Sequence, residues 1–234
     1  MSLAPTSPTI LIVAAGRGLG HAIAEQFHLR GWHVIGTVRP GSGRTRLHEL
    51  AENGGVEVET LDIGDPGQIA ALRRRLDGRE LDAVFVNAGI STEDQNVTVS
   101  EVTDDEFTEV MLTNALNPMR VLESLQDLVT PTGLLGVMSS GQGSITNNER
   151  GQREIYRSSK AALNQLMRSY AARQPEPKRT LLLMAPGWIR TDLGGPDAPL
   201  AIEDSIPLLV NVVLEQLGTP GLRFLDYRNQ VVPW

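Results

Sequence analysis

A phenol and an amine that could exchange protons with a substrate lie four residues apart, at Tyr156 and Lys160 in the stretch 154–170. This stretch is rich in Ala, Leu and Met and lacks Gly and Pro, which predicts a helix. Residues four apart share a helical face, with Cβ atoms about 5–6 Å apart. A neighbouring positive charge favours the phenolate, and lowering a tyrosine pKa from about 10 to about 7 needs roughly 4 kcal/mol, which only a partly buried site can supply. The pair is therefore predicted to be a general acid/base in a water-poor cleft.

The alternative is an ordinary half-buried tyrosine beside a solvated lysine, because Tyr-x-x-x-Lys is a weak pattern by itself. The chain has only two lysines, Lys160 and Lys178, among its 21 basic residues, and only three tyrosines. Chance therefore produces this spacing in roughly a few percent of such chains, so a false match is less common here than for most short motifs. The choice between a catalytic pair and two ordinary residues therefore depends on the elements that position Tyr156 and Lys160.

The composition restricts the class of protein. A chain of 234 residues with 41% hydrophobic and 21% charged residues suits one large α/β domain, expected over 1–234. A net charge of −7 predicts neither a nucleic-acid nor a membrane partner. The absence of cysteine excludes disulfides and thiol catalysis, and the histidines lack metal-ligand spacing, so no metal is predicted. Residues 1–9 lack a basic signal-peptide region, which favours a cytoplasmic protein.

Apolar runs alternate with helix-forming stretches along the chain. Such alternation predicts a doubly wound, Rossmann-type parallel sheet of about seven strands with helices on both faces. The expected strands are 9–15, 32–40, 56–65, 81–90, 133–140, 179–187 and 221–227. The expected helices are 21–31, 44–53, 66–78, 104–130, 154–173 and 203–217.

Polar and glycine-rich residues follow several of these strands. In such sheets, ligands bind beyond the carboxyl ends of the strands, where the strand order reverses. Glycines after the first strand let backbone amides approach a pyrophosphate, and the following helix N-terminus favours its charge. The residues that follow a strand are Gly16, Gly18 and Gly20, then Arg39, Asp62, Asn87, Ser140 and Pro186.

The cofactor preference can be predicted from the end of the second strand. An acidic residue there binds a ribose 2′-hydroxyl, whereas an arginine accommodates a 2′-phosphate. The chain has Arg39 at this point, and Arg17 in the glycine turn can approach the same phosphate. Unless both arginines are simply solvated, the predicted cofactor is NADP(H).

With these motifs in place, the chain resembles the short-chain dehydrogenase/reductase family from about Thr9 to Trp234, and its ending resembles the C-factor-like branch. The resemblance implies a catalytic set of Ser140, Tyr156, Lys160 and Asn114. It also implies that the cofactor is bound by Gly16, Arg17, Gly18, Leu19, Gly20, Arg39, Asp62, Ile63, Asn87, Ala88, Gly89, Tyr156, Lys160, Pro186, Gly187, Ile189 and Thr191.

The same resemblance implies roles for the catalytic set. Tyr156 donates a proton to a substrate carbonyl oxygen, Ser140 polarises that oxygen, and Lys160 lowers the tyrosine pKa and binds the nicotinamide ribose. Asn114 is expected to hold a water that connects Lys160 to solvent. Ser139 is the alternative to Ser140.

The chain departs from the family pattern at two positions. Ala14 stands where the turn usually has its first glycine, and Val86 replaces the first asparagine of the common Asn-Asn-Ala-Gly. Neither change removes a proton-transfer group.

The expected function is hydride transfer between NADP(H) and a carbonyl or alcohol substrate. The alternative is a non-catalytic NADP(H)-binding regulatory protein. A methyltransferase-like use of a similar sheet would need an acidic residue at the end of the second strand, where this chain has Arg39. Substrate specificity is expected in the loops 91–103 and 141–153 and in 188–202, which is expected to act as a lid. Family members commonly pair through long helices, so a homodimer or homotetramer is expected by analogy.

Overall fold

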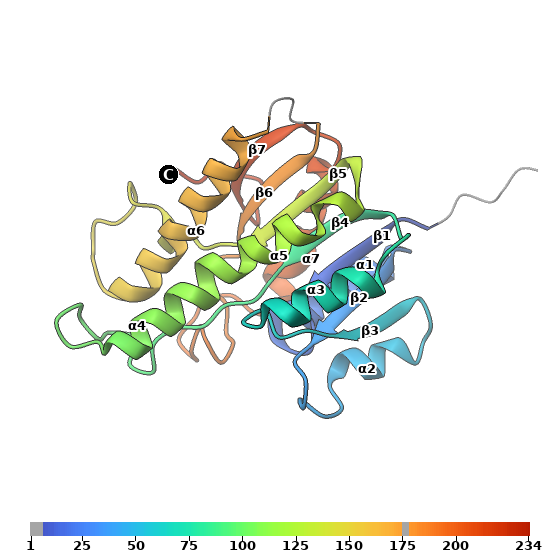
Figure 1. Ribbon diagram of the computed structural model, residues 1–234. Helices are drawn as coiled ribbons and strands as arrows, with labels where there is room; N and C mark the ends of the chain where they lie inside the picture. Colours follow the sequence, from blue (N-terminus) through green and yellow to red (C-terminus); the bar gives the residue numbers. More distant parts are fainter. Residues whose placement is uncertain (1–6, 175–177) are drawn as a thin grey trace, which may run out of the picture.

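The computed structural model describes residues 7–174 and 178–234, which contain one sheet of seven parallel strands. The expected domain range 1–234 also includes 1–6 and 175–177, which lie outside the described residues. The strand order is β3-β2-β1-β4-β5-β6-β7, so the order reverses between β1 and β4. This architecture confirms the predicted doubly wound sheet (Figure 1). The strands are β1 (Thr9–Val13), β2 (His33–Val38), β3 (Val56–Thr60), β4 (Leu81–Val86), β5 (Val129–Met138), β6 (Thr180–Ala185) and β7 (Gly221–Asp226).

Helices cover both faces of the sheet, and a separate hydrophobic core lies on each face. One face is covered by α3 (Pro66–Arg75), α5 (Asn117–Leu125) and α6 (Glu154–Ala172), which lie in front in Figure 1. The other is covered by α1 (Gly18–Leu29), α2 (Arg46–Ala51) and α7 (Ile202–Gln216). The helix α4 (Asp104–Met111) extends beyond the sheet towards the loops that follow β4 (Figure 1).

The side chains of β1 show why its sequence forms a central strand. Leu11 and Val13 enter one core, and Ile10 and Ile12 enter the other. Burying each of these side chains stabilises the fold by roughly 1.5–3 kcal/mol. A strand that is buried on both faces therefore has a continuous apolar sequence rather than an alternating one.

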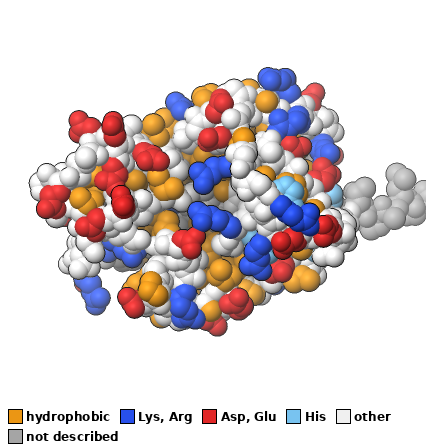
Figure 2. All heavy atoms as spheres, turned by 90° about the horizontal axis from the view of Figure 1, so that it is seen from below, with side chains coloured by type: hydrophobic (Ala, Val, Ile, Leu, Met, Phe, Trp, Pro, Cys, Tyr) orange, Lys and Arg blue, Asp and Glu red, His pale blue; other side chains and the backbone are white. Residues whose placement is uncertain are grey.

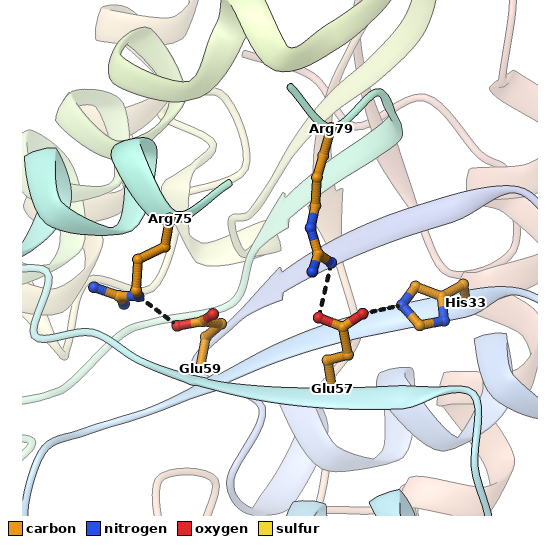
Figure 3. A network of polar contacts seen from close by, with 5 residues as sticks. All are labelled: His33, Glu57, Glu59, Arg75 and Arg79. Atoms are coloured by element: carbon orange, nitrogen blue, oxygen red, sulfur yellow. Dashed lines mark hydrogen bonds and ion pairs between the residues drawn. The ribbon is translucent and has the colours of Figure 1, made fainter. Parts of the chain in front are cut away.

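An ionic network covers the edge strand β3 (Figure 3). Glu57 pairs with His33 at 2.8 Å and with Arg79 at 2.7 Å, while Glu59 pairs with Arg75 at 2.7 Å. Partial burial raises the pKa of Glu57, but the hydrogen bonds from Arg79 and His33 outweigh it and hold that pKa below its ordinary value. Charged side chains on an edge strand also oppose pairing with a strand of another molecule.

The expected helix 104–130 is wrong as one continuous element. It consists of α4, a π-helical segment over Leu112–Leu116, α5 and a short 3₁₀ turn over Gln126–Leu128. Pro118 has no backbone N–H to donate to the carbonyl four residues earlier, so a regular α-helix cannot pass through this point with all its bonds. Such π segments often mark functional sites.

Several strands are shorter than expected at their carboxyl ends. The expected ranges 9–15, 56–65 and 81–90 end at Val13, Thr60 and Val86. The residues beyond these points form turns instead of sheet, and they include the predicted site residues Asp62, Ile63, Asn87, Ala88 and Gly89. At the other end of its strand, β5 begins at Val129, four residues before the expected start.

Within 7–174 and 178–234, no helix has both the length and the apolar character needed to cross a membrane. The same residues contain no group of three or more His, Asp or Glu side chains that could hold a metal ion.

Ala14 adopts a left-handed backbone conformation directly after β1, with φ of 64°. This is the position where the family pattern has glycine, and an L-residue there costs roughly 1–2 kcal/mol. The turn is held by the Thr37 hydroxyl, which accepts from the Ala14 amide at 3.0 Å. It is also packed tightly, since a Cβ at Gly20 would lie 2.0 Å from the Ala14 carbonyl oxygen. Ala14 therefore keeps the shape of the glycine turn at a cost in strain.

The substitution Ala14→Gly should stabilise the protein by about 1 kcal/mol, because glycine adopts a positive φ without steric strain. For a chain of this size the expected rise in melting temperature is roughly 2–4 °C, measured by circular dichroism. The matched control is Ala15→Gly at the next, fully buried position, which is not among the positive-φ residues and should lower the melting temperature. A lower melting temperature for Ala14→Gly would contradict the strain.

Candidate active site

Tyr156 and Lys160 lie one turn apart on the inner face of α6. Their exposed fractions are 8% and 2%. The Lys160 Nζ lies 5.9 Å from the centroid of the Tyr156 ring, and it donates a hydrogen bond of 2.9 Å to the carbonyl of Met138 at the end of β5. The two groups therefore share one buried face, as their spacing indicates.

Burial moves the pKa values of both groups. It lowers the pKa of Lys160 from 10.5 to about 8 and raises that of Tyr156 above 10. A hydrogen bond with Ser140 and the positive charge of Arg153 act in the opposite direction on Tyr156. The structure thus differs from the expectation that Lys160 lowers the pKa of Tyr156: burial outweighs the lowering effects, and the cation that lowers it is Arg153.

The two serines at the end of β5 have different surroundings. The Ser140 hydroxyl accepts from the Gln142 amide at 3.1 Å and lies within hydrogen-bonding reach of Tyr156. The Ser139 hydroxyl donates to Asn164 at 2.6 Å inside a buried pair. Ser140 is therefore the serine that the structure brings together with Tyr156, while Ser139 connects β5 to α6.

The Asn114 side chain lies in the π-helical segment and is fully buried. Its Oδ1 accepts from the Ile90 amide at 2.8 Å, and its Nδ2 donates to the Ile90 carbonyl at 2.8 Å and to Ser159 at 2.9 Å. Through these contacts the side chain fixes the turn after β4 against α6, and the expected water at Asn114 stays a prediction. The backbone carbonyl of Asn114 is the group that Pro118 leaves without its α-helical donor.

The turn Asn87-Ala88-Gly89 lies against Lys160 and Asn114. A Cβ on Gly89 would come within 3.3 Å of the Lys160 Nζ and 3.4 Å of the Asn114 Oδ1. Ala88 packs on the core at the same turn. The glycine thus lets the backbone approach the lysine closely without displacing either neighbour.

The predicted phosphate-binding residues lie at the ends of adjacent strands. Arg17 follows β1 and Arg39 follows β2, and both are exposed. Arg17 forms an ion pair of 2.6 Å with Asp192, whose side chain is 86% exposed. Asp62 follows β3, where its carboxylate accepts from the Gly64 amide at 2.8 Å, and the neighbouring Ile63 packs on the core. No sequence pattern predicts the contact between Arg17 and Asp192.

The segment 188–202 is a compact loop held largely by its own contacts. The Trp188 indole donates to the Gly194 carbonyl at 2.7 Å, and Thr191 accepts from the Gly194 amide at 3.0 Å. Ile189 forms an isolated parallel bridge with Leu200. The loop starts from the Pro186-Gly187 turn, where the Pro186 carbonyl accepts from Ser205 of α7. It reaches the loop 91–103 through a 2.9 Å bond from Gln95 to the Leu193 carbonyl.

Three buried polar side-chain atoms have no hydrogen-bond partner among the described residues. They are the Asn87 Oδ1, the Ser91 Oγ and the Gln142 Oε1. All three follow β4 or β5 at the carboxyl edge of the sheet. Buried polar atoms nearly always have partners, so this edge fits a polar ligand, such as a dinucleotide, and its substrate.

A doubly wound sheet with a glycine turn after β1, and with Ser140, Tyr156 and Lys160 gathered beyond β4 and β5, defines a dinucleotide-dependent oxidoreductase. Comparison with known proteins agrees. A family model described as enoyl-(acyl carrier protein) reductase matches residues 13–218. The chain belongs to the short-chain dehydrogenase/reductase family.

Individual relatives support this assignment. A short-chain dehydrogenase/reductase of Burkholderia multivorans with bound NADP is 56% identical, with a TM-score of 0.96 and coverage of 98% of this chain and 100% of that chain. A carbonyl reductase of Pseudomonas aeruginosa PAO1 in complex with NADP is 36% identical, with a TM-score of 0.90 and coverage of 98% and 100%. The C-signal protein of Myxococcus xanthus is 35% identical over 157 residues, which span 66% of this chain and 93% of that protein. The last similarity agrees with the C-factor-like branch.

Replacing Asn114 with alanine should lower the free energy of unfolding by about 3 kcal/mol, because the Ile90 amide and carbonyl and Ser159 all lose a partner. Urea denaturation measures this loss. The control Thr113→Ala lies in the same π segment and should change stability by about 0.5 kcal/mol or less. Equal stability of the two variants would rule out the anchoring role of Asn114.

Proposed function

We propose that this protein transfers a hydride between NADP(H) and a small carbonyl or alcohol substrate. The observation that carries the proposal is the buried pair of Tyr156 and Lys160, with the partly buried Ser140 beside Tyr156 and the Gly89 turn against Lys160. The two similar solved structures that contain NADP support the choice of cofactor.

The residues around the carboxyl edge fit this cofactor. The turn Gly16–Gly20, including Leu19, would hold the pyrophosphate at the start of α1, and Arg17 and Arg39 the 2′-phosphate. Asp62 and Ile63 would contact the adenine, with Asn87-Ala88-Gly89 beneath its ribose. The turn Pro186-Gly187, with Ile189 and Thr191, would hold the nicotinamide amide. When bound, the cofactor supplies or accepts the hydride.

The protein supplies the proton and the geometry. In the reducing direction, the Tyr156 hydroxyl donates a proton to the substrate oxygen, and Ser140 polarises that oxygen by a hydrogen bond. Lys160, with a pKa of about 8, is mainly protonated at neutral pH and binds the ribose hydroxyls. Asn114 holds the turn that faces Lys160.

The alternative, a non-catalytic NADP(H)-binding regulatory protein, would not need the acid/base pair. Both of its members are present and buried together, which favours an enzyme.

The proposal extends to the whole molecule. We place it in the cytoplasm as a single domain, with 188–202 as the segment that covers the substrate. A homodimer or homotetramer would use the groove between α5 and α6, which includes Leu116, Met119 and Leu166. Leu112 and Leu166 expose 40% and 37% of their surfaces, and apolar exposure of this kind suits pairing between copies.

Tyr156→Phe should reduce kcat by about 10²–10⁴-fold, because it removes the proton donor. NADPH affinity, followed by fluorescence titration, should change little, because the phenyl ring remains. Tyr170→Phe is the matched control: Tyr170 lies on the same helix, and its hydroxyl bonds Gln126 away from the catalytic serine. If Tyr156→Phe retained most of its turnover, the assignment would be wrong.

Arg39→Asp should invert the preference for NADPH over NADH, since it replaces a cation that attracts the 2′-phosphate with an anion that repels it. The measurement is the ratio of the two kcat/KM values at fixed substrate. Arg74→Asp makes the same charge change on the exposed side of α3 and should leave that ratio unchanged. If the Arg39→Asp enzyme still preferred NADPH, Arg39 would not be a ligand of the 2′-phosphate.

A further inference from the structure

Arg153 is the residue directly before α6, three positions before Tyr156, and its backbone is left-handed. Its φ is 50°, Gln152 before it has φ of 60°, and Gly151 has φ of 64°. Two successive non-glycine residues in this conformation cost roughly 1–3 kcal/mol each, and such strain gathers at functional sites. The loop 141–153 thus enters the catalytic helix through a strained turn that sets the position of Arg153.

The Arg153 guanidinium lies beside an exposed indole and one helical turn before the Tyr156 phenol in the chain. Its central carbon is 6.0 Å from the centroid of the Trp188 ring, and its positive charge lowers the pKa of Tyr156. Trp188 is 46% exposed and follows the Pro186-Gly187 turn. Arg153 and Trp188 therefore bring together two segments, the loop 141–153 and the segment 188–202, at the start of the helix that carries Tyr156.

No carboxylate neutralises this cation in the described part of the chain. Arg153 takes part in none of the ion pairs there. The carboxylate of its neighbour Glu154 accepts from the Val99 amide at 2.9 Å, and Asp192 of the segment 188–202 is paired with Arg17. A protein with a net charge of −7 thus presents an unpaired arginine at the start of the helix that carries its proton donor.

We propose that the substrate carries a carboxylate, which Arg153 binds while the substrate's apolar part packs on Trp188 and its carbonyl oxygen meets Tyr156. A guanidinium matches a carboxylate with two parallel hydrogen bonds, and the indole beside it limits access of water, which strengthens the attraction. Figure 2 shows that acidic, basic and hydrophobic side chains are interspersed on the lower side of the molecule. This inference rests on the proposed function and adds a substrate class to it.

The test compares two aldehydes that differ in one charge: 4-carboxybenzaldehyde and its methyl ester, methyl 4-formylbenzoate. NADPH oxidation gives kcat/KM for each. The wild-type ratio, acid over ester, should be about tenfold or more, as expected for a charge-assisted hydrogen bond. Arg153→Gln should bring the ratio near one, and Arg153→Lys should retain part of it. The control Arg150→Gln removes an exposed charge from the same loop and should keep the wild-type ratio.

A binding measurement separates this inference from the proposed function. Calorimetric titration of benzoate should show binding to the wild type and Arg150→Gln at least about fivefold tighter than to Arg153→Gln. Carboxylate binding that depends on Arg153, without turnover of any aldehyde or alcohol, would overturn the proposed function alone. Benzoate binding, or an acid-to-ester ratio, that is the same with and without Arg153 would overturn the substrate class and leave the hydride-transfer proposal standing.

Discussion

The buried ammonium of Lys160 is the constraint around which the site is built. It crosses from α6 to the end of β5, where the Met138 carbonyl accepts its hydrogen bond. A buried cation is costly unless it is paired or hydrogen-bonded, so the backbone around it has to come close. Two glycines approach it closely: a Cβ on Gly89 would lie 3.3 Å from the Lys160 Nζ, and one on Gly143 would lie 2.9 Å from the Lys160 Cβ. The turn after β4, the turn after β5 and α6 are thereby held in one arrangement.

Much of the fold follows from local sequence, because a strand buried on both faces must be apolar throughout. The runs 9–15 and 81–90 illustrate this, since each contains a strand that the structure confirms. Their ends could not be predicted, because the apolar character continues past Val13 and Val86 into turns whose shape depends on neighbouring elements. The π-helical segment was missed for a similar reason, as the only local sign of it is Pro118.

How well each part of the site could be predicted depends on how far apart in the chain its contacting residues lie. Tyr156 and Lys160 are neighbours through helical spacing alone, so their shared face could be inferred. The contact between Arg17 and Asp192 joins residues 175 positions apart, and no sequence periodicity predicts it. Arg153 was missed because its importance comes from a left-handed backbone and from its contact with Trp188, and no local sequence pattern predicts either of them. The direction in which the pKa of Tyr156 shifts likewise depends on how deeply that side chain is buried, which the sequence does not show.

Asn114 binds both backbone groups of Ile90, which is the boundary between the turn after β4 and the loop 91–103. On one side of Ile90 lies the turn that must keep its shape for proton transfer, and on the other begins the loop 91–103. Because one amide binds both backbone groups of Ile90, the turn before Ile90 is anchored without any contribution from the side chains of the loop. The fold can therefore diversify its substrates in the way that antibodies diversify their antigens, with a variable rim on an unchanging frame.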